Sequence, residues 1–134
     1  MFLMKLRPEE KFAFLRLAHY IARIDDHFGD NEQEIITEYC IEMGIDDMIF
    51  EAAHFDLQET LKRFSSRESQ KILIMELMIL IHADDKYEEK EHLLVNEIAE
   101  HYGFDPISMQ HYSQWGKAVS ALYSQGKLFT NALD

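Results

Sequence analysis

The sequence predicts an all-α domain with about seven helices. Apolar residues recur with the period of a helix along the chain, and no stretch alternates between apolar and polar residues as a half-buried strand would. The breaks between apolar stretches carry residues that begin or end helices, such as Pro8, Gly44 and Gly103. Because 134 residues is the usual size of one domain, we expect a single hydrophobic core.

Three helices are expected in the first part of the chain. The first starts at Pro8, whose fixed backbone angle suits the first helical position, and runs to about Ile24. The second spans about 30–43 and ends at Gly44, because glycine readily adopts the left-handed conformation of a helix cap. A short third helix is expected to follow Asp46, which would cap it.

Four further helices are expected after residue 55, each marked by a capping signal. They are a linking helix at about 57–64 behind Asp56 and Glu59, a long apolar helix behind Ser65 and Glu68, a helix over about 89–102 that ends at Gly103, and a last helix behind Asp105 and Pro106. The tail at 126–134 has few apolar anchors, so we expect it to fray.

The apolar stretch from Ile72 to Ile81 should form the central helix. Apolar residues occupy every face of this stretch, and Glu76 is its only polar residue. A helix that is apolar all round is buried in the core. The residues expected to pack around it are Phe14, Leu15, Ala18, Ile21, Ile36, Tyr39, Leu94, Ile98 and Trp115.

An internal repeat with an offset of 59 residues organises the sequence. Six pairs of identical residues coincide at this offset: Asp25 and Asp84, Asp26 and Asp85, Glu32 and Glu91, Glu38 and Glu97, Gly44 and Gly103, and Asp46 and Asp105. The sequence therefore predicts two repeated helical units, at about 8–55 and about 66–124, around the central apolar helix.

Each unit carries a pair of aspartates where a long helix ends. Negative charge at the carbonyl end of a helix is unfavourable by about 0.3–1 kcal/mol per carboxylate. Carboxylates beside the free carbonyl oxygens of a helix end are the ligands that a hard cation such as Ca²⁺ or Mg²⁺ prefers. The candidate metal ligands are Asp25, Asp26, Glu32, Asp84, Asp85 and Glu91.

A second interpretation of the acidic loops needs no metal. The aspartates would turn toward the amide end of the following helix, where Glu32 and Glu91 would act as capping-box residues. Neither Gly29 nor Glu88 has the Ser or Thr side chain that completes such a box. The loops are also not EF-hands, because apolar residues stand where the last position of the loop requires a glutamate. The sequence leaves both interpretations open.

The repeated helix–loop–helix pattern resembles the TerB-like tellurite-resistance family, which is related to the N-terminal domain of the DjlA co-chaperone. The stretch ADDKYEEKE shows the likeness best, and its matching residues are Ala83, Asp84, Tyr87 and Glu91. The matching residues of the first copy are Asp25, Phe28 and Glu32, and the copies depart from the motif at Ile24, Asp26 and Asp85.

The resemblance covers about residues 12–123. It implies a helical fold, an acidic surface that binds Ca²⁺, a link to tellurite or other stress resistance, and no enzymatic activity.

The charge of the chain narrows the class of partner. Thirteen basic and 25 acidic side chains give a net charge of −12. The sequence has no cluster of lysines and arginines that would follow a phosphate backbone, so nucleic acids and anionic membranes are poor partners. A protein partner with a basic surface suits this charge, as does a metal ion.

Two further features place the chain in the cytoplasm. Its single cysteine, Cys40, cannot form an internal disulfide, so nothing calls for an oxidising compartment. The apolar run from Ile72 to Ile81 is well below the roughly 20 residues that span a bilayer, so we expect no integral membrane segment.

A di-iron oxidoreductase is the minor alternative function. Two E-x-x-H pairs, Glu51 with His54 and Glu89 with His92, have the spacing found in helical di-iron proteins. Such a site also needs further inward-facing glutamates on long helices. The segment around Glu51 is short, and Glu89 stands at a helix start that should be solvated, so an enzyme is the minority interpretation.

Overall fold

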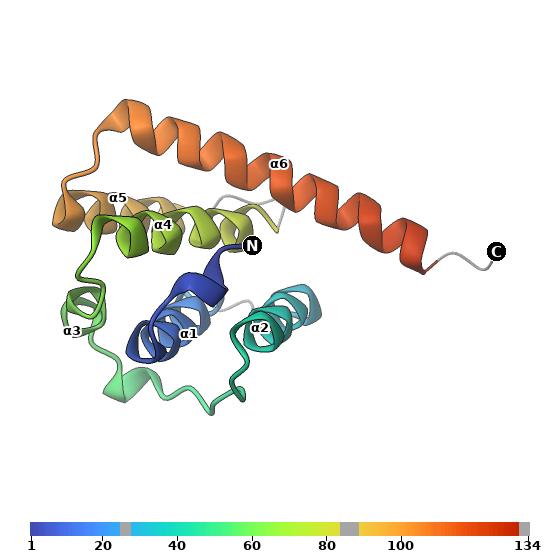
Figure 1. Ribbon diagram of the computed structural model, residues 1–134, viewed down its shortest axis with the longest axis horizontal. Helices are drawn as coiled ribbons and strands as arrows, with labels where there is room; N and C mark the ends of the chain where they lie inside the picture. The colour runs from blue at the N-terminus through green and yellow to red at the C-terminus, as the bar shows by residue number, and fades with distance from the viewer. Residues whose placement is uncertain (25–27, 84–88, 132–134) are drawn as a thin grey trace.

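The computed structural model describes residues 1–24, 28–83 and 89–131, and its regular secondary structure in these ranges is all helical. These ranges contain six α-helices, two short 3-10 helices and no β-strand (Figure 1). The elements are η1 (Leu3–Lys5), α1 (Pro8–Ala22), α2 (Asp30–Met43), η2 (Ala52–His54), α3 (Leu57–Lys62), α4 (Arg67–His82), α5 (Glu89–Tyr102) and α6 (Pro106–Thr130). None of the described helices is long and apolar enough to cross a membrane.

Helix α4 is the central helix, as the sequence predicts. Its apolar residues from Ile72 to Ile81 are buried, except for Met75, which is partly buried against the core. Helices α1, α5 and α6 and the η1 segment all pack on it. The expected core partners are also buried, with one exception: Trp115 is half-buried, and its ring stacks on Phe2 with the centroids 6.1 Å apart. The prediction that Trp115 lies in the core is therefore wrong.

The most extensive helix pair is α4 with α6. Helix α6 runs along one side of the molecule, and its C-terminal end projects beyond the other helices (Figure 1). Gly116 of α6 lies directly against Met78 of α4. A Cβ atom built on Gly116 would lie 2.4 Å from the Met78 Cβ and 2.8 Å from its carbonyl carbon. Only a glycine allows the two backbones to approach this closely.

Most helix ends follow the predicted signals. Helices α2 and α5 end at Gly44 and Gly103, whose φ angles are 69° and 72°. The side chains of Asp56 and Asp105 accept hydrogen bonds from backbone N–H groups three residues on, at 3.1 and 2.7 Å. At α4 the cap is Ser66, which accepts from the N–H of Ser69, and not Ser65, so that prediction is wrong by one residue.

The predicted third helix is absent. Residues 45–51 have no helical structure, and only the η2 turn follows them. The Asp47 side chain holds this segment against α1 instead, because it lies 2.7 Å from the Nε2 of buried His19. Burial by itself would raise the pKa of Asp47, but hydrogen bonds from His19, the Met48 N–H and Gln33 outweigh it and lower the pKa. The segment is thus held by the contact between Asp47 and His19, which are 28 residues apart in the sequence, and not by a helix capped at Asp46.

The C-terminal helix is longer than predicted. Helix α6 continues to Thr130, so the expectation of a frayed tail at 126–134 is wrong for residues 126–130, while 132–134 lie outside the described residues. Lys127 in the last turns of α6 forms an ion pair with Glu34 of α2 at 3.1 Å. This contact ties the end of α6 to another helix.

The helix boundaries keep the 59-residue offset only in part. Helices α1 and α4 begin at Pro8 and Arg67, and α2 and α5 have the same offset at both ends. Helix α6 has no counterpart after α2, where the chain is irregular. Two equivalent three-helix units are therefore not present in the described residues, and the repeat remains a prediction from the sequence.

Replacing Gly116 with alanine should destabilise the protein. The new methyl group would overlap the Met78 backbone, and overpacking of this kind costs about 1–3 kcal/mol. Urea unfolding measures the loss. Gly126→Ala on the same helix is the matched control, because a Cβ there meets nothing within 4 Å, and alanine should add up to about 1 kcal/mol of helix stability. Equal effects of the two substitutions would contradict the close packing.

Candidate functional site

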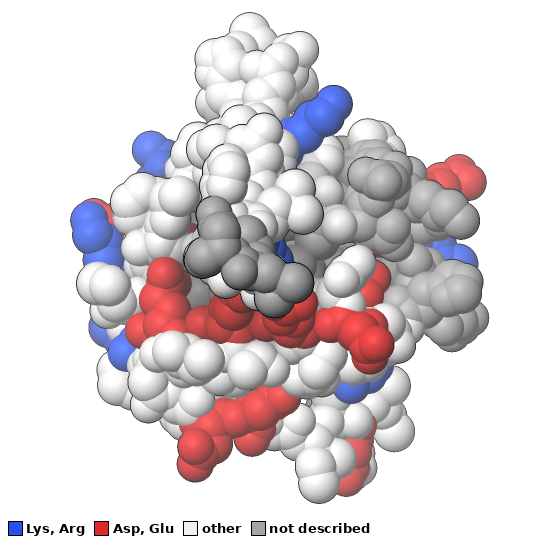
Figure 2. All heavy atoms as spheres, turned by 90° about the vertical axis from the view of Figure 1, so that its right-hand side faces the viewer, with Lys and Arg blue, Asp and Glu red and all other residues white. Residues whose placement is uncertain are grey.

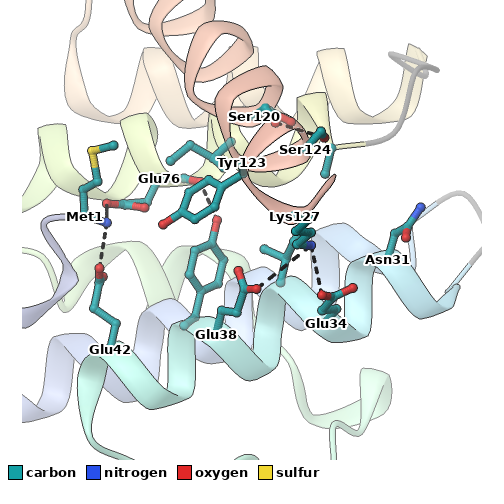
Figure 3. Close-up of a pocket in the computed structure, with 14 residues that line it drawn as sticks. Met1, Asn31, Glu34, Glu38, Glu42, Glu76, Ser120, Tyr123, Ser124 and Lys127 are labelled. Atoms are coloured by element: carbon teal, nitrogen blue, oxygen red, sulfur yellow. Dashed lines mark hydrogen bonds and ion pairs between the residues drawn. The ribbon is translucent and has the colours of Figure 1, made fainter. Parts of the chain in front are cut away.

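A cavity of about 220 Å³ lies between α2, α4 and α6 (Figure 3). Four carboxylates line it: three from α2 and one from α4. They are Glu34, Glu38, Glu42 and Glu76. Lys127 of α6 and the N-terminal Met1 also reach it, and Tyr39, Tyr123, Ile35 and Ile79 give it apolar walls. The cavity therefore combines strong negative charge with apolar surface.

The three glutamates of α2 form a row along one side of the helix. Glu34, Glu38 and Glu42 are spaced by four residues, which places them on the same face about 6 Å apart along the axis. Acidic side chains form a band across this side of the molecule (Figure 2). Like charges at this spacing destabilise a helix by about 0.2–0.5 kcal/mol per pair, so nearby cations are needed to offset them.

Glu76 is a fully buried carboxylate on the central helix, with an exposed fraction of 0%. Its Oε1 accepts hydrogen bonds from the Met1 ammonium at 2.8 Å and from the Phe2 N–H at 2.9 Å. Its Oε2 has no hydrogen-bond partner among the described residues. Tyr39 fixes the helix beside it by donating its hydroxyl to the Glu76 carbonyl oxygen at 2.8 Å.

Two ammonium groups lie against these carboxylates (Figure 3). The Met1 ammonium is 2.8 Å from both Glu42 and Glu76. The Lys127 ammonium is 3.1 Å from Glu34 and 4.0 Å from Glu38. Each is held between two glutamates, so this surface has the geometry to bind protonated amines.

The carboxylates also change the acidity of neighbouring groups. Burial alone would lower the pKa of the Met1 α-amino group, but hydrogen bonds to Glu42 and Glu76 outweigh it and raise the pKa. Burial and the nearby glutamates both raise the pKa of Tyr123, and burial with Glu76 raises that of Tyr39 well above its usual value. The cavity therefore favours cations and disfavours new negative charge.

The predicted metal ligands are only partly described. Asp25, Asp26, Asp84 and Asp85 lie outside the described residues. Glu32 accepts a hydrogen bond from the Gly29 N–H at 3.1 Å, which is the contact that the capping interpretation predicts.

The described parts of the chain bring no metal-ligand set together. Glu91 is buried on α5. In the described ranges no three His, Cys, Asp or Glu residues are arranged to hold a metal ion.

The residues that flank the two acidic loops nevertheless meet at the cavity. Asn31, in the first turn of α2, and Ala83, directly before Asp84, both line it. The same acidic space is thus bordered by the described ends of both loops.

The other residues singled out in the sequence lie elsewhere. The exposed His54 Nδ1 lies 2.6 Å from the Glu51 carboxylate, and Glu89 and His92 are exposed at the start of α5. A di-iron site requires ligands that face the interior of the helical bundle, and neither pair does so. Cys40 is buried as expected, and burial together with Asp47 and Asp46 raises its thiol pKa to about 11.

The acidic cavity is not among the sites predicted from the sequence. Its two signals were visible: the four-residue spacing of Glu34, Glu38 and Glu42, and the single carboxylate of Glu76 in an otherwise apolar helix. The contacts with Met1 and Lys127 join residues far apart in the chain, so no local pattern indicates them. The chain matches no family model, no curated protein and no solved structure.

The Met1 ammonium should make stability depend on pH. Its pKa in the folded protein lies above the usual value of 8.0, so its ion pairs contribute fully below that pH, and the contribution is lost as pH rises through the raised pKa. The free energy of unfolding, measured in urea between about pH 7 and 10, should fall more steeply than for the Nα-acetylated protein, which lacks the charge. Identical pH profiles would show that these ion pairs do not stabilise the fold.

Proposed function

We propose that this protein is a non-enzymatic helical domain that binds a basic segment of a partner protein with the acidic face of α2. The observation that supports this function is the way the face holds ammonium groups. Met1 and Lys127 each lie between two glutamates of the cavity. A lysine side chain of a partner presents the same chemical group.

The outer part of this face is accessible to a partner. The Glu34 and Glu38 side chains are 52% and 42% exposed, although they already contact Lys127. The four carboxylates and two ammonium groups leave a formal charge of −2 when all are ionised. This local negative charge and the net charge of −12 both attract a basic partner and repel an acidic one.

A hard-cation site in the repeated acidic loops is the second candidate. The resemblance to the TerB-like family supports it, and it would make the protein a stress-related domain of the tellurite-resistance type. The observation in its favour is that Asn31 and Ala83 border one cavity. Under this proposal Asp25, Asp84 and their neighbouring carboxylates supply oxygen ligands for Ca²⁺ or Mg²⁺.

Removing charge from the α2 face should weaken binding of a basic peptide. We expect Glu34→Gln with Glu38→Gln to reduce the affinity for a fluorescently labelled lysine-rich peptide about fivefold or more, because two partly exposed ion pairs contribute about 1 kcal/mol together. Fluorescence anisotropy at low salt measures the affinity, which should fall as salt is added.

The control for this experiment is Glu97→Gln with Glu100→Gln on α5. Both side chains are exposed and outside the cavity, and the net charge changes by the same amount. The control should bind as the natural protein does. Equal weakening by both double variants would mean that only net charge matters and would contradict a specific binding face.

A cation bound in the acidic loops should stabilise the folded protein. A ligand that binds only the folded state adds about 2.7 kcal/mol at a hundredfold excess over its dissociation constant. Thermal melts with chelator and then with Ca²⁺ or Mg²⁺, at constant ionic strength, measure this gain. Asp25→Asn with Asp84→Asn should abolish it. A natural protein that does not respond to either ion would exclude the second candidate and leave the first intact.

A further inference from the structure

The buried Glu76 carboxylate has unused capacity to accept a hydrogen bond. Glu76 lines the cavity, and its Oε2 is fully buried and accepts no hydrogen bond from any described residue. Buried carboxylate oxygens are almost always hydrogen-bonded, because leaving one without a donor is costly. An N–H group of a ligand in the cavity would supply the donor.

The spacing of the carboxylates indicates what kind of cation fits. Glu34, Glu38 and Glu42 follow one another about 6 Å apart along α2. Two neighbouring glutamates of the row can share one cation, but all three span about 12 Å along the helix, which is more than one Ca²⁺ ion can reach with ligand distances of about 2.3–2.6 Å. The amines of a linear polyamine, separated by three or four methylene groups, are about 5–6 Å apart in an extended chain. The row on α2 matches that spacing.

The walls of the cavity suit the methylene groups between such amines. Ile35, Ile79 and Tyr39 line the cavity, and the ring of Tyr123 lies between the carboxylates (Figure 3). Aromatic faces also attract alkylammonium groups. The volume of about 220 Å³ is below the range of about 300–1,000 Å³ that is typical of sites for drug-sized ligands, so a slender chain fits better than a bulky one.

We propose that the cavity between α2, α4 and α6 binds a linear aliphatic polyamine. This inference rests on the proposed function, because it assigns a ligand class to the same acidic face. The Met1 and Lys127 ammonium groups mark two positions that the amines of the ligand take. The ligand exchanges with them: its amines pair with Glu76, Glu42 and Glu38, and the displaced ammonium groups return to water.

The test is isothermal titration calorimetry of the folded protein with a triamine, spermidine. Butylamine and Mg²⁺ are measured at the same ionic strength as comparisons. We expect one triamine per chain, bound about tenfold more tightly than either comparison cation. Glu38→Gln should weaken triamine binding about tenfold, because it removes the middle carboxylate of the row. Glu97→Gln, outside the cavity, should leave the affinity unchanged.

A second variant addresses the buried carboxylate itself. Glu76→Gln keeps the shape of the side chain and should also weaken triamine binding, and a thermal melt checks that the variant is folded. Amide NMR signals that shift with triamine should belong to residues of α2, α4 and α6 around the cavity.

Several outcomes would overturn the inference. Equal affinities for triamine and Mg²⁺, or no effect of Glu38→Gln, would reduce the binding to general attraction of counterions. If the lysine-rich peptide binds the α2 face but the triamine binds no better than butylamine, the polyamine site is wrong and the proposed function stands. If neither the peptide nor the triamine binds, both proposals fail.

Discussion

The close approach of α6 to α4 at Gly116 and Met78 is the constraint on which the rest of the structure depends. Because a side chain at Gly116 would overlap the backbone of Met78, the two helices pack at a distance that only glycine permits. This contact sets the position of α6, whose C-terminal half then lies opposite α2 and brings Lys127 to Glu34. The cavity follows from that placement, since its walls are the facing sides of α2 and α6 and its base is the central helix α4. A side-chain volume at one position thus decides whether the acidic site exists.

Two unfavourable arrangements of negative charge in the site are offset by two ammonium groups. Burial of the Glu76 carboxylate is costly without a partner, and the row on α2 places like charges on neighbouring turns. The Met1 and Lys127 ammonium groups offset both, because each lies between two carboxylates. The two ammonium groups do not provide a hydrogen bond to every carboxylate oxygen, because the Oε2 of Glu76 has no donor among the described residues. The face therefore retains an excess of negative charge, and this excess connects the role of the two ammonium groups in the fold with the binding role that we propose.

The sequence predicts those parts of the fold that depend on local physics. The all-α class, the burial of α4 and the glycine ends of α2 and α5 follow from apolar period and capping chemistry, and all of these are confirmed. Two of the errors have tertiary causes: the His19 to Asp47 contact replaces a third helix, and the Lys127 to Glu34 contact accompanies a longer α6. The same reason explains the site. The glutamates of the cavity were visible as a pattern, but the pairing of Glu76 with Met1 joins residues 75 positions apart, which no local signal encodes.

The helix ends that precede the two acidic loops differ in charge, even though the loop sequences are similar. Arg23 directly follows α1, two residues before Asp25. Its guanidinium donates to the His19 carbonyl at 3.2 Å and lies 3.9 Å from the Phe28 ring centre. Burial lowers its pKa, but a guanidinium remains charged, so the end of α1 carries a permanent cation that opposes the helix dipole. The residue at the same place in the second copy is His82, 3.0 Å from Ser113. Burial and the nearby Lys117 lower the pKa of His82, so at neutral pH it is largely uncharged. The carbonyl end of α4 therefore lacks the permanent cation that Arg23 supplies at the end of α1, and the positive charge near His82 comes from Lys117 of another helix, α6.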